Sequence, residues 1–172
     1  MRPEQIETAR LILRRARPGD LADLHAAMSD PRAMRYWSRP AHARLDETAA
    51  FLQAMIDESR GDSDDFVVEY QGRVIGKAGA WRLPEVGFLL HPECWGLGLG
   101  HEAMAAVVGH LFRWHPVPHL TAEADPRNAG SLALLAKLGF RETHRAERTL
   151  LWGDEWCDSV YLALEREAWS PA

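Results

Sequence analysis

Apolar residues recur along the chain with two different periods, and each period predicts a type of secondary structure. Residues 85–91 alternate in the manner of a β-strand, and Pro92 ends the run. Beyond residue 99, apolar side chains fall at i, i+3, i+4 and i+7, which predicts one buried face of a helix: Met104, Val107, Val108 and Leu111. Between the strand and the helix, every second residue is a glycine: Gly96, Gly98 and Gly100.

The same reading divides the rest of the chain into alternating strands and helices. Helices are expected from Asp20, from Asp46, and between Asn128 and Gly139. Residues 34–44 are expected to be irregular and residues 61–65 to form a polar loop. Further strands are expected over residues 10–16, 66–70, 74–81, 120–124, 140–151 and 156–164. The resulting order, β-α-α-β-β-β-α-β-α-β-β, predicts an α+β fold with a mixed sheet.

Length and composition narrow the class of protein. The 172 residues predict a single domain, 1–172, with a core of its own. A net charge of −5 gives no reason to expect nucleic-acid binding and mildly favours a cationic or amine-bearing substrate. The two cysteines, Cys94 and Cys157, are isolated, which fits a reducing compartment. Because no signal peptide or membrane-spanning apolar run is seen, we expect a soluble cytoplasmic protein without a membrane partner.

The glycine-rich turn is the strongest candidate for a binding site. Glycines let the backbone approach a ligand closely, and the amides at a helix start are unpaired and attract anions. This pattern predicts a phosphate cradle, although a plain glycine-rich turn has the same spacing. A P-loop is excluded because His101-Glu102 stand where Lys-Ser/Thr is required, and a dinucleotide motif because the third glycine comes one residue too soon.

Several motifs together resemble the GNAT superfamily of acetyl-CoA-dependent N-acetyltransferases, and within it the RimJ/RimL type, which acetylates protein N-termini. The resemblance covers nearly the whole chain, and it is carried by the order of the motifs rather than by one of them. It rests on Arg10-Leu11-Ile12-Leu13-Arg14, Asp20, Ser29-Asp30-Pro31, His91 to Gly100, Asn128-Ala129-Gly130-Ser131, Lys137-Leu138-Gly139-Phe140, and Trp152 to Asp158.

The resemblance implies a mostly antiparallel twisted sheet flanked by helices, with an acyl-CoA cleft between the central strands. It implies acetyl-CoA as the co-substrate and no metal. The pantetheine arm would pair with the main chain of Phe88, Leu89 and Leu90. The pyrophosphate would lie on the amides of Gly96, Leu97, Gly98, Leu99, Gly100 and His101. Trp95 stands where the superfamily pattern has Gln or Arg, but the RimJ/RimL type often has Trp there.

Acetyl transfer needs a group that takes a proton from the amine. Glu85 and Glu123 are the candidates, on strands expected to be neighbours, and Glu85 matches a carboxylate found at this place in RimJ/RimL-like chains. For each of them, a solvated strand end or a salt-bridge partner is an equal alternative, and a water chain is a further alternative to both. Trp37 lies in the irregular segment that walls the acceptor pocket in GNAT proteins, so we expect Trp37, together with Glu123, to contact the acceptor.

The leaving thiolate needs a proton donor, and the resemblance implies Ser131 for this role. Asn128 would then contact the pantetheine arm. The simpler interpretation is a helix start, because an Asn side chain at this position normally accepts a hydrogen bond from the amide three residues on. Ser131 shares a helical face with Leu134, Leu135 and Leu138, which points its hydroxyl inward.

Three classes of function remain at this point. The first is a GNAT N-acetyltransferase, acting on a protein or peptide N-terminus or alternatively on a small amine such as a polyamine or an aminoglycoside-like drug. The second is a non-catalytic acyl-CoA-binding module, and the third is a phosphate-binding protein of another class. His91 and Cys94 have metal-ligand spacing, but no second ligand pair follows, so no metal is expected. The late Trp-rich hairpin is compatible with a homodimer.

Overall fold

The computed structural model describes residues 1–57 and 61–171 of the protein. Its strands are β1 Gln5–Glu7, β2 Leu11–Arg14, β3 Asp64–Tyr70, β4 Arg73–Arg82, β5 Glu85–Leu90, β6 His119–Ala124, β7 Arg141–Trp152 and β8 Glu155–Glu165. Its α-helices are α1 Leu21–Met28, α2 Pro31–Met34, α3 Leu45–Asp57, α4 Leu99–Trp114 and α5 Ala129–Lys137. Short 3-10 turns cover Pro18–Asp20, Pro92–Cys94 and Arg166–Ala168.

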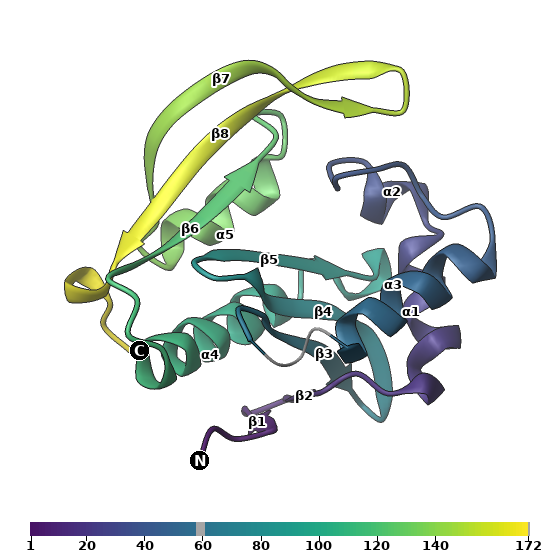
Figure 1. The fold of residues 1–172 in the computed structure, drawn as a ribbon, viewed down its shortest axis with the longest axis horizontal. Coiled ribbons are helices and arrows are strands. Elements are labelled where there is room, and N and C mark those ends of the chain that lie inside the picture. Colours follow the sequence, from purple (N-terminus) through teal and green to yellow (C-terminus); the bar gives the residue numbers. More distant parts are fainter. Residues whose placement is uncertain (58–60, 172) are drawn as a thin grey trace.

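The strands form one eight-stranded sheet in the order β1-β2-β3-β4-β5-β6-β8-β7. Neighbouring strands are antiparallel except β5 and β6, which run parallel. The mixed, mostly antiparallel sheet flanked by helices confirms the expected fold (Figure 1). In the described ranges, no helix has the length and apolarity needed to cross a membrane.

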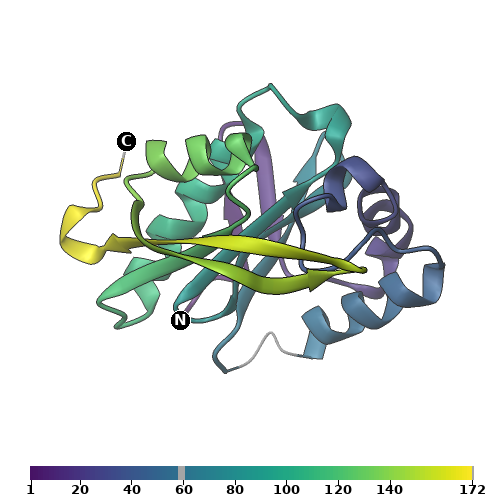
Figure 2. The same cartoon turned by 90° about the horizontal axis from the view of Figure 1, so that it is seen from above.

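Helices pack on both faces of the sheet and bury a separate apolar cluster on each. On one face, α4 and α5 cover side chains such as Leu13, Phe66 and Leu120. On the other face, α1 and α3 cover Val67 and Leu89. Successive strand residues point to opposite faces, so Phe66 and Val67 belong to different clusters. Figure 2 shows the two groups of helices on opposite sides of the sheet.

The sheet opens between its two central parallel strands. Glu85 is paired with Thr121, and the amide of Thr121 donates to the carbonyl of Pro84 at 2.9 Å, but no further register pair joins β5 to β6. Beyond that point the two strands diverge, as Figure 1 shows. The outer edge of β5 from Gly87 onward is therefore left without a neighbouring strand, at the place where an acyl-CoA cleft was expected.

The structure corrects three local expectations. β1 and the one-turn helix α2 were not predicted, because three or four residues carry too little periodicity to register. Residues 64 and 65 belong to strand β3 rather than to a polar loop, and both carboxylates are buried beside cationic side chains. The carboxylate of Asp20 does not cap α1; it pairs instead with the Arg14 guanidinium, at 2.9 Å.

Candidate active site

Two cavities meet where β5 and β6 diverge. The first, of about 680 Å³, lies between the end of β5, the glycine-rich turn and the start of α5. The second, of about 490 Å³, lies between α3, β4, β5 and the β7–β8 hairpin. Arg35, Tyr36 and Trp37, which follow α2, line both cavities. The two cavities are therefore adjacent.

The glycine-rich turn gives one wall of the first cavity a backbone geometry suited to an anion. Gly96 and Gly98 have φ angles of 75° and 78°, a left-handed conformation that favours glycine. Gly98 is the N-cap of α4, so the amides of the first helical turn are directed toward the cavity mouth. Gly100 permits close packing of α4 on α5, because a Cβ there would lie 3.0 Å from Cδ1 of Leu134.

Arg10 braces this turn from outside the cavity. Its Nη1 donates to the carbonyl of Leu97 at 2.8 Å, and its Nε donates to Oε2 of Glu102 at 2.7 Å. Glu102 lies in the first turn of α4 and also accepts from the Thr8 hydroxyl and the Arg10 amide. The guanidinium thus neutralises a carboxylate that would otherwise leave a negative charge uncompensated beside the glycine-rich turn.

The free edge of β5 forms the floor between the cavities. The amide of His91 donates to the carbonyl of Ile75 at 2.7 Å. Because hydrogen-bonded pairs alternate along antiparallel strands, the main chain of Leu89 faces β4, and that of Phe88 and Leu90 faces the gap. The Leu90 carbonyl accepts from the Trp95 indole at 3.0 Å, so Phe88 is the residue whose main-chain groups are best placed for an extended ligand.

Ser131 and Asn128 stand on the opposite wall of the first cavity, at the start of α5. The Asn128 side chain accepts from the amide of Ser131 at 3.2 Å and is the N-cap of the helix, as expected. Ser131 is partly buried, and no described protein group lies within hydrogen-bonding distance of its hydroxyl. The hydroxyl is therefore available to a ligand in the cavity.

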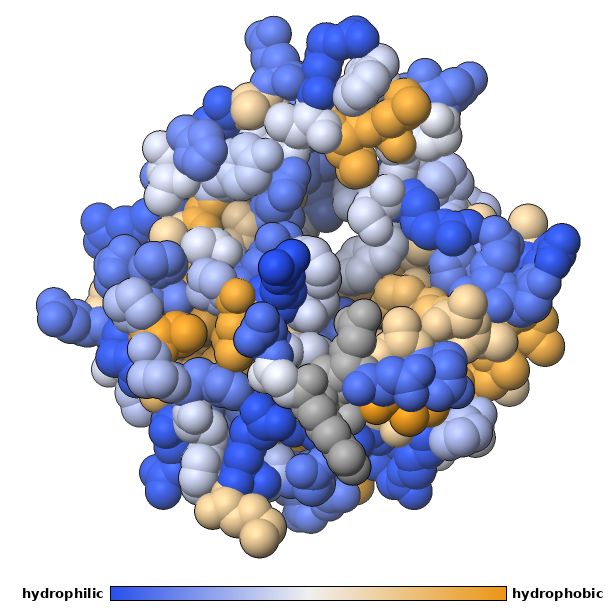
Figure 3. Space-filling view, viewed as in Figure 1, coloured by the Kyte–Doolittle hydropathy of each residue, from blue (hydrophilic) through white to orange (hydrophobic). Residues whose placement is uncertain are grey.

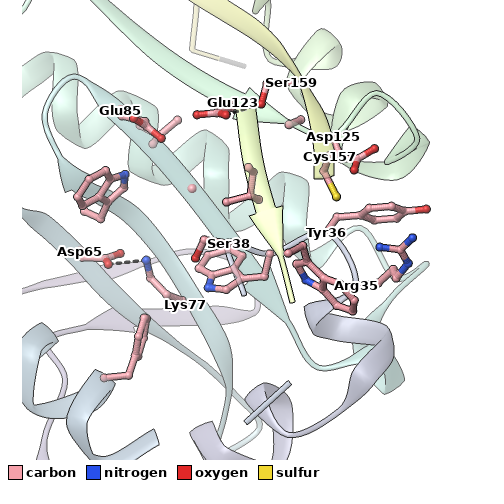
Figure 4. A pocket seen from close by; sticks show the side chains of 18 of the residues that line it. Arg35, Tyr36, Ser38, Asp65, Lys77, Glu85, Glu123, Asp125, Cys157 and Ser159 are labelled. Carbon is pink, nitrogen blue, oxygen red and sulfur yellow. Dashed lines mark hydrogen bonds and ion pairs between the residues drawn. The ribbon is translucent and has the colours of Figure 1, made fainter. Parts of the chain in front are cut away.

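The second cavity holds the two candidate bases and the candidate acceptor-binding tryptophan. Glu85 and Glu123 line it (Figure 4), and so does Trp37. The Trp37 ring lies over Gly87, with Cη2 4.0 Å from the position of a Cβ at that glycine. Glu123 is exposed and accepts from the Ser159 hydroxyl at 2.5 Å.

The two glutamates differ in their electrostatic environment. Burial raises the pKa of Glu85 above its usual range, and the negative charge of Glu123 adds to this effect, while a hydrogen bond from Trp81 opposes it. A carboxylate with a raised pKa is a stronger base than an ordinary one. Of the two glutamates, Glu85 therefore has the properties that proton transfer from an amine requires.

Three contacts form a bridge beside the junction of the cavities. The Trp152 indole donates to the carbonyl of Met34 at 3.1 Å, and Glu155 accepts from Arg127 at 2.8 Å and lies 3.5 Å from Arg35. The bridge connects the β7–β8 hairpin to the segment after α2. Figure 3 shows the opening beneath the hairpin as a hollow in the middle of this face.

The structure thus brings most of the expected site residues together. All the cofactor candidates line the first cavity except Leu97, whose side chain is exposed. Leu99 lines it too, although its side chain is buried in the core, and its amide lies at the helix start. Sequence reasoning missed Arg35, Asp65 and Lys77, and it placed Arg10 in the family motif of residues 10–14 without assigning it a role. Their partners lie far away in the sequence. Among the described residues, no group of three or more His, Cys, Asp or Glu side chains is arranged to hold a metal ion.

Comparison with known proteins identifies the class of this site. A family model described as "Acetyltransferase (GNAT) domain" matches residues 10–141. An uncharacterised N-acetyltransferase of Bacillus subtilis, YnaD, is 24% identical over 173 residues, covering 96% of this chain and 99% of its own. The [ribosomal protein uS5]-alanine N-acetyltransferase of Escherichia coli is 31% identical over 93 residues, covering 54% of this chain and 48% of its own.

Solved structures show the same fold at lower sequence identity. RimL, described as a ribosomal L7/L12 α-N-protein acetyltransferase in complex with coenzyme A, superimposes with a TM-score of 0.83. The match covers 96% of this chain and 99% of that one, at 17% identity. At this identity, the likeness is evidence for the fold alone.

Proposed function

Because the chain belongs to the GNAT family of acetyltransferases, we propose that it acetylates the N-terminal amine of a protein or peptide. The protein is an acetyl-CoA-dependent N-acetyltransferase; the acceptor and the roles of individual residues are our proposal. The observation that carries it is the meeting of two cavities at the free edge of β5, one with an anion-binding helix start and one with a carboxyl group of raised pKa. The relative named for a ribosomal-protein acceptor, 31% identical over 93 residues, supports a peptide acceptor.

The first cavity is suited to acetyl-CoA. The amides from Gly96 to His101 would bind the pyrophosphate, and the free main-chain groups of Phe88 would bind the pantetheine arm as a neighbouring strand does. Asn128 and Ser131 line the opposite wall. Acetyl-CoA supplies an acetyl group activated as a thioester, and the chain of this protein holds that group at the gap between β5 and β6.

The acceptor binds in the second cavity, with its amine close to Glu85. Glu85 takes a proton from the ammonium, either directly or through water, so that the neutral amine attacks the thioester carbonyl carbon. As the C–S bond breaks, the Ser131 hydroxyl donates a hydrogen bond to the sulfur and stabilises the thiolate, while the nitrogen releases its second proton to water, which balances the proton that the thiolate finally takes up. Trp37 and Glu123 line the path of the acceptor and hold its first residue beside the free edge of β5.

An acceptor screen tests the proposal. Purified protein is mixed with acetyl-CoA and with peptides, polyamines or aminoglycosides, and release of free thiol is measured. We expect turnover with peptides that carry a free N-terminus and none with the same peptides blocked at the N-terminus. Turnover with polyamines or aminoglycosides alone would assign the small-amine function instead. Tight binding of acetyl-CoA without thiol release from any amine would identify a non-catalytic acyl-CoA-binding module.

A further inference from the structure

The second cavity, which we call the acceptor cavity, contains a buried ion pair that the proposed chemistry does not use. Nζ of Lys77 lies 2.5 Å from Oδ2 of Asp65, and the two side chains are 3% and 6% exposed. In Figure 4 they point toward one another and lie across the cavity from Glu123 and Ser159. Burying two charges is costly, and an apolar pair of similar volume is often at least as stable. Stability alone therefore does not explain why this pair is there.

The pair retains hydrogen-bonding capacity on the cavity side. An ammonium group has three donors, and in the part of the chain that the structure describes, the Asp65 carboxylate is the one acceptor close to Lys77. The rings of Trp37 and Phe51 flank Nζ, with centroids 5.6 Å and 6.0 Å away, and aromatic faces accept only weakly. Oδ1 of Asp65 accepts from the Phe66 amide at 3.2 Å and keeps further lone pairs.

Glycines occupy the row between the free edge of β5 and Asp65, and the ring of Trp37 lies over the first of them, Gly87. Asp65 is paired with Gly79, and Gly79 is paired with Gly87, so two glycines lie in one row beside Asp65. A Cβ at Gly79 would lie 2.6 Å from Oδ1 of Asp65, so a side chain there would displace the carboxylate. Strands are spaced about 4.8 Å apart, which puts the pair roughly 5–10 Å from the edge of β5.

We propose that the Asp65–Lys77 ion pair is a subsite that recognises the second residue of the peptide acceptor through an uncharged dipolar side chain. This inference rests on the proposed peptide acceptor. A hydroxyl or amide can accept from the ammonium and donate to the carboxylate at the same time. An apolar side chain would exclude water from both charges and replace none of its hydrogen bonds. An extended peptide advances about 3.4 Å per residue, so the second side chain spans the gap from the reacting amine.

The test compares peptides that differ only between threonine and valine, which have nearly the same shape. With the substitution at the second position, we expect kcat/KM of the wild-type protein to be at least tenfold higher for threonine. With the same substitution at the fourth position, we expect a ratio close to one. Equal rates for the two second-position peptides overturn the subsite. If neither peptide is acetylated although acetyl-CoA binds, the peptide acceptor itself is wrong, and the subsite is rejected with it.

A double variant connects the preference to the ion pair. Asp65→Leu combined with Lys77→Met replaces both charges by apolar side chains of similar shape, so the fold is expected to survive. Unchanged affinity for coenzyme A verifies folding, and the threonine-to-valine ratio is expected to fall to about one or below. The control, Glu142→Gln with Arg145→Met, removes an exposed ion pair outside the cavity and should preserve the ratio. A preference that persists in the Asp65/Lys77 double variant contradicts the inference.

Discussion

At the scale of single residues, Ser131 is the sharpest test of the proposed chemistry. Ser131→Ala removes a hydroxyl that has no described protein partner and lines the acetyl-CoA cavity. Because the donor is needed mainly once charge develops on the sulfur, we expect kcat to fall ten- to a thousandfold, roughly 1.4–4 kcal/mol, with little change in the Kd of acetyl-CoA. Steady-state kinetics and calorimetry separate the two effects. Normal turnover would leave the thiolate to be protonated by water.

Asn128→Ala is the matched comparison, because Asn128 and Ser131 occupy the same helix start. The Asn128 side chain accepts from the Ser131 amide, so its loss should cost about 1 kcal/mol of unfolding free energy as well as affinity for acetyl-CoA. Ser131→Ala leaves that cap in place. If the two variants lose stability equally, the residues are both structural, and the division of roles is wrong.

Glu85→Gln tests the general base. Unlike Asn128→Ala, this variant is expected to be more stable than the wild type at neutral pH. Activity of the wild type should rise with pH through a pKa above the usual range of glutamate, and the variant should lose both this acidic limb and most of kcat. A carboxyl whose folded pKa is raised above its unfolded value gives stability that is fully present below the unfolded pKa and is lost as pH rises through the folded pKa. At neutral pH the variant should therefore have a higher Tm than the wild type. A wild-type pH profile in the variant would move attention to Glu123 or to water.

At the scale of elements, the brace between Arg10 and α4 can be tested independently of the glycines. Substituting Gly98 is a poor probe, because its φ of 78° strains any residue with a Cβ. Arg10→Met instead leaves the Glu102 carboxylate uncompensated at the helix start. For a half-exposed pair we expect the Kd of acetyl-CoA to rise about three- to tenfold, or ~0.6–1.4 kcal/mol.

A substitution of Glu102 decides whether the charge of its carboxylate causes the loss of acetyl-CoA affinity in Arg10→Met. Adding Glu102→Gln to Arg10→Met should recover most of the lost affinity, because the repelling carboxylate is then gone. Calorimetry on the wild type, the two single variants and the double variant gives the coupling energy. If the losses of the single variants simply add, Arg10 supports the turn by its contact with the Leu97 carbonyl alone.

The elements themselves were largely predictable because their patterns are long. The alternation over residues 85–91, the helical spacing after residue 99 and the last hairpin each span six or more residues, and all three appear within about two residues of expectation. Asp64 and Asp65 were assigned to a loop because adjacent carboxylates normally favour solvent. Their burial depends on Arg15, Lys77 and His110, which are distant in sequence. No local pattern reports such partners.

At the scale of the whole molecule, the topology of the sheet explains why the two cavities lie side by side. The parallel neighbours β5 and β6 stay together only at Glu85 and then separate, while the antiparallel hairpin on the far side bends back over the gap. In our proposal, one sheet thus provides both the free edge of β5 for acetyl-CoA and the β7–β8 hairpin that covers the acceptor cavity. The expected order of elements contained the two strands, but their separation depends on tertiary packing and was implied only by the family resemblance.

Asp64 ties three distant parts of this architecture together. Its carboxylate, at the buried start of β3, lies 2.8 Å from Arg15 beside β2, 2.9 Å from His110 of α4, and 2.6 Å from His115 just after that helix. Burial alone would raise its pKa, but the hydrogen bonds from His110, His115 and Arg15 outweigh it and hold the pKa well below the usual range. A depressed pKa means that the folded state binds a proton less readily than the unfolded state does.

The last prediction follows from the lowered pKa of Asp64. The contribution of Asp64 to stability is present above the unfolded pKa, about 3.9, and is lost as pH falls through the folded pKa. Asp64→Asn leaves the largely buried Arg15 guanidinium without its carboxylate and removes the acceptor of two histidine side chains, so it should cost about 3–5 kcal/mol at pH 7. Below pH 4 the unfolded wild type binds a proton at Asp64 that the folded state does not, so the free energy of unfolding of the wild type falls and the difference from the variant should shrink. Urea unfolding of both proteins between pH 3 and 7 measures this, with exposed Asp62→Asn as a control expected to change stability by less than about 0.5 kcal/mol. A difference that stays constant over this range would show that Asp64 acts through packing and not through charge.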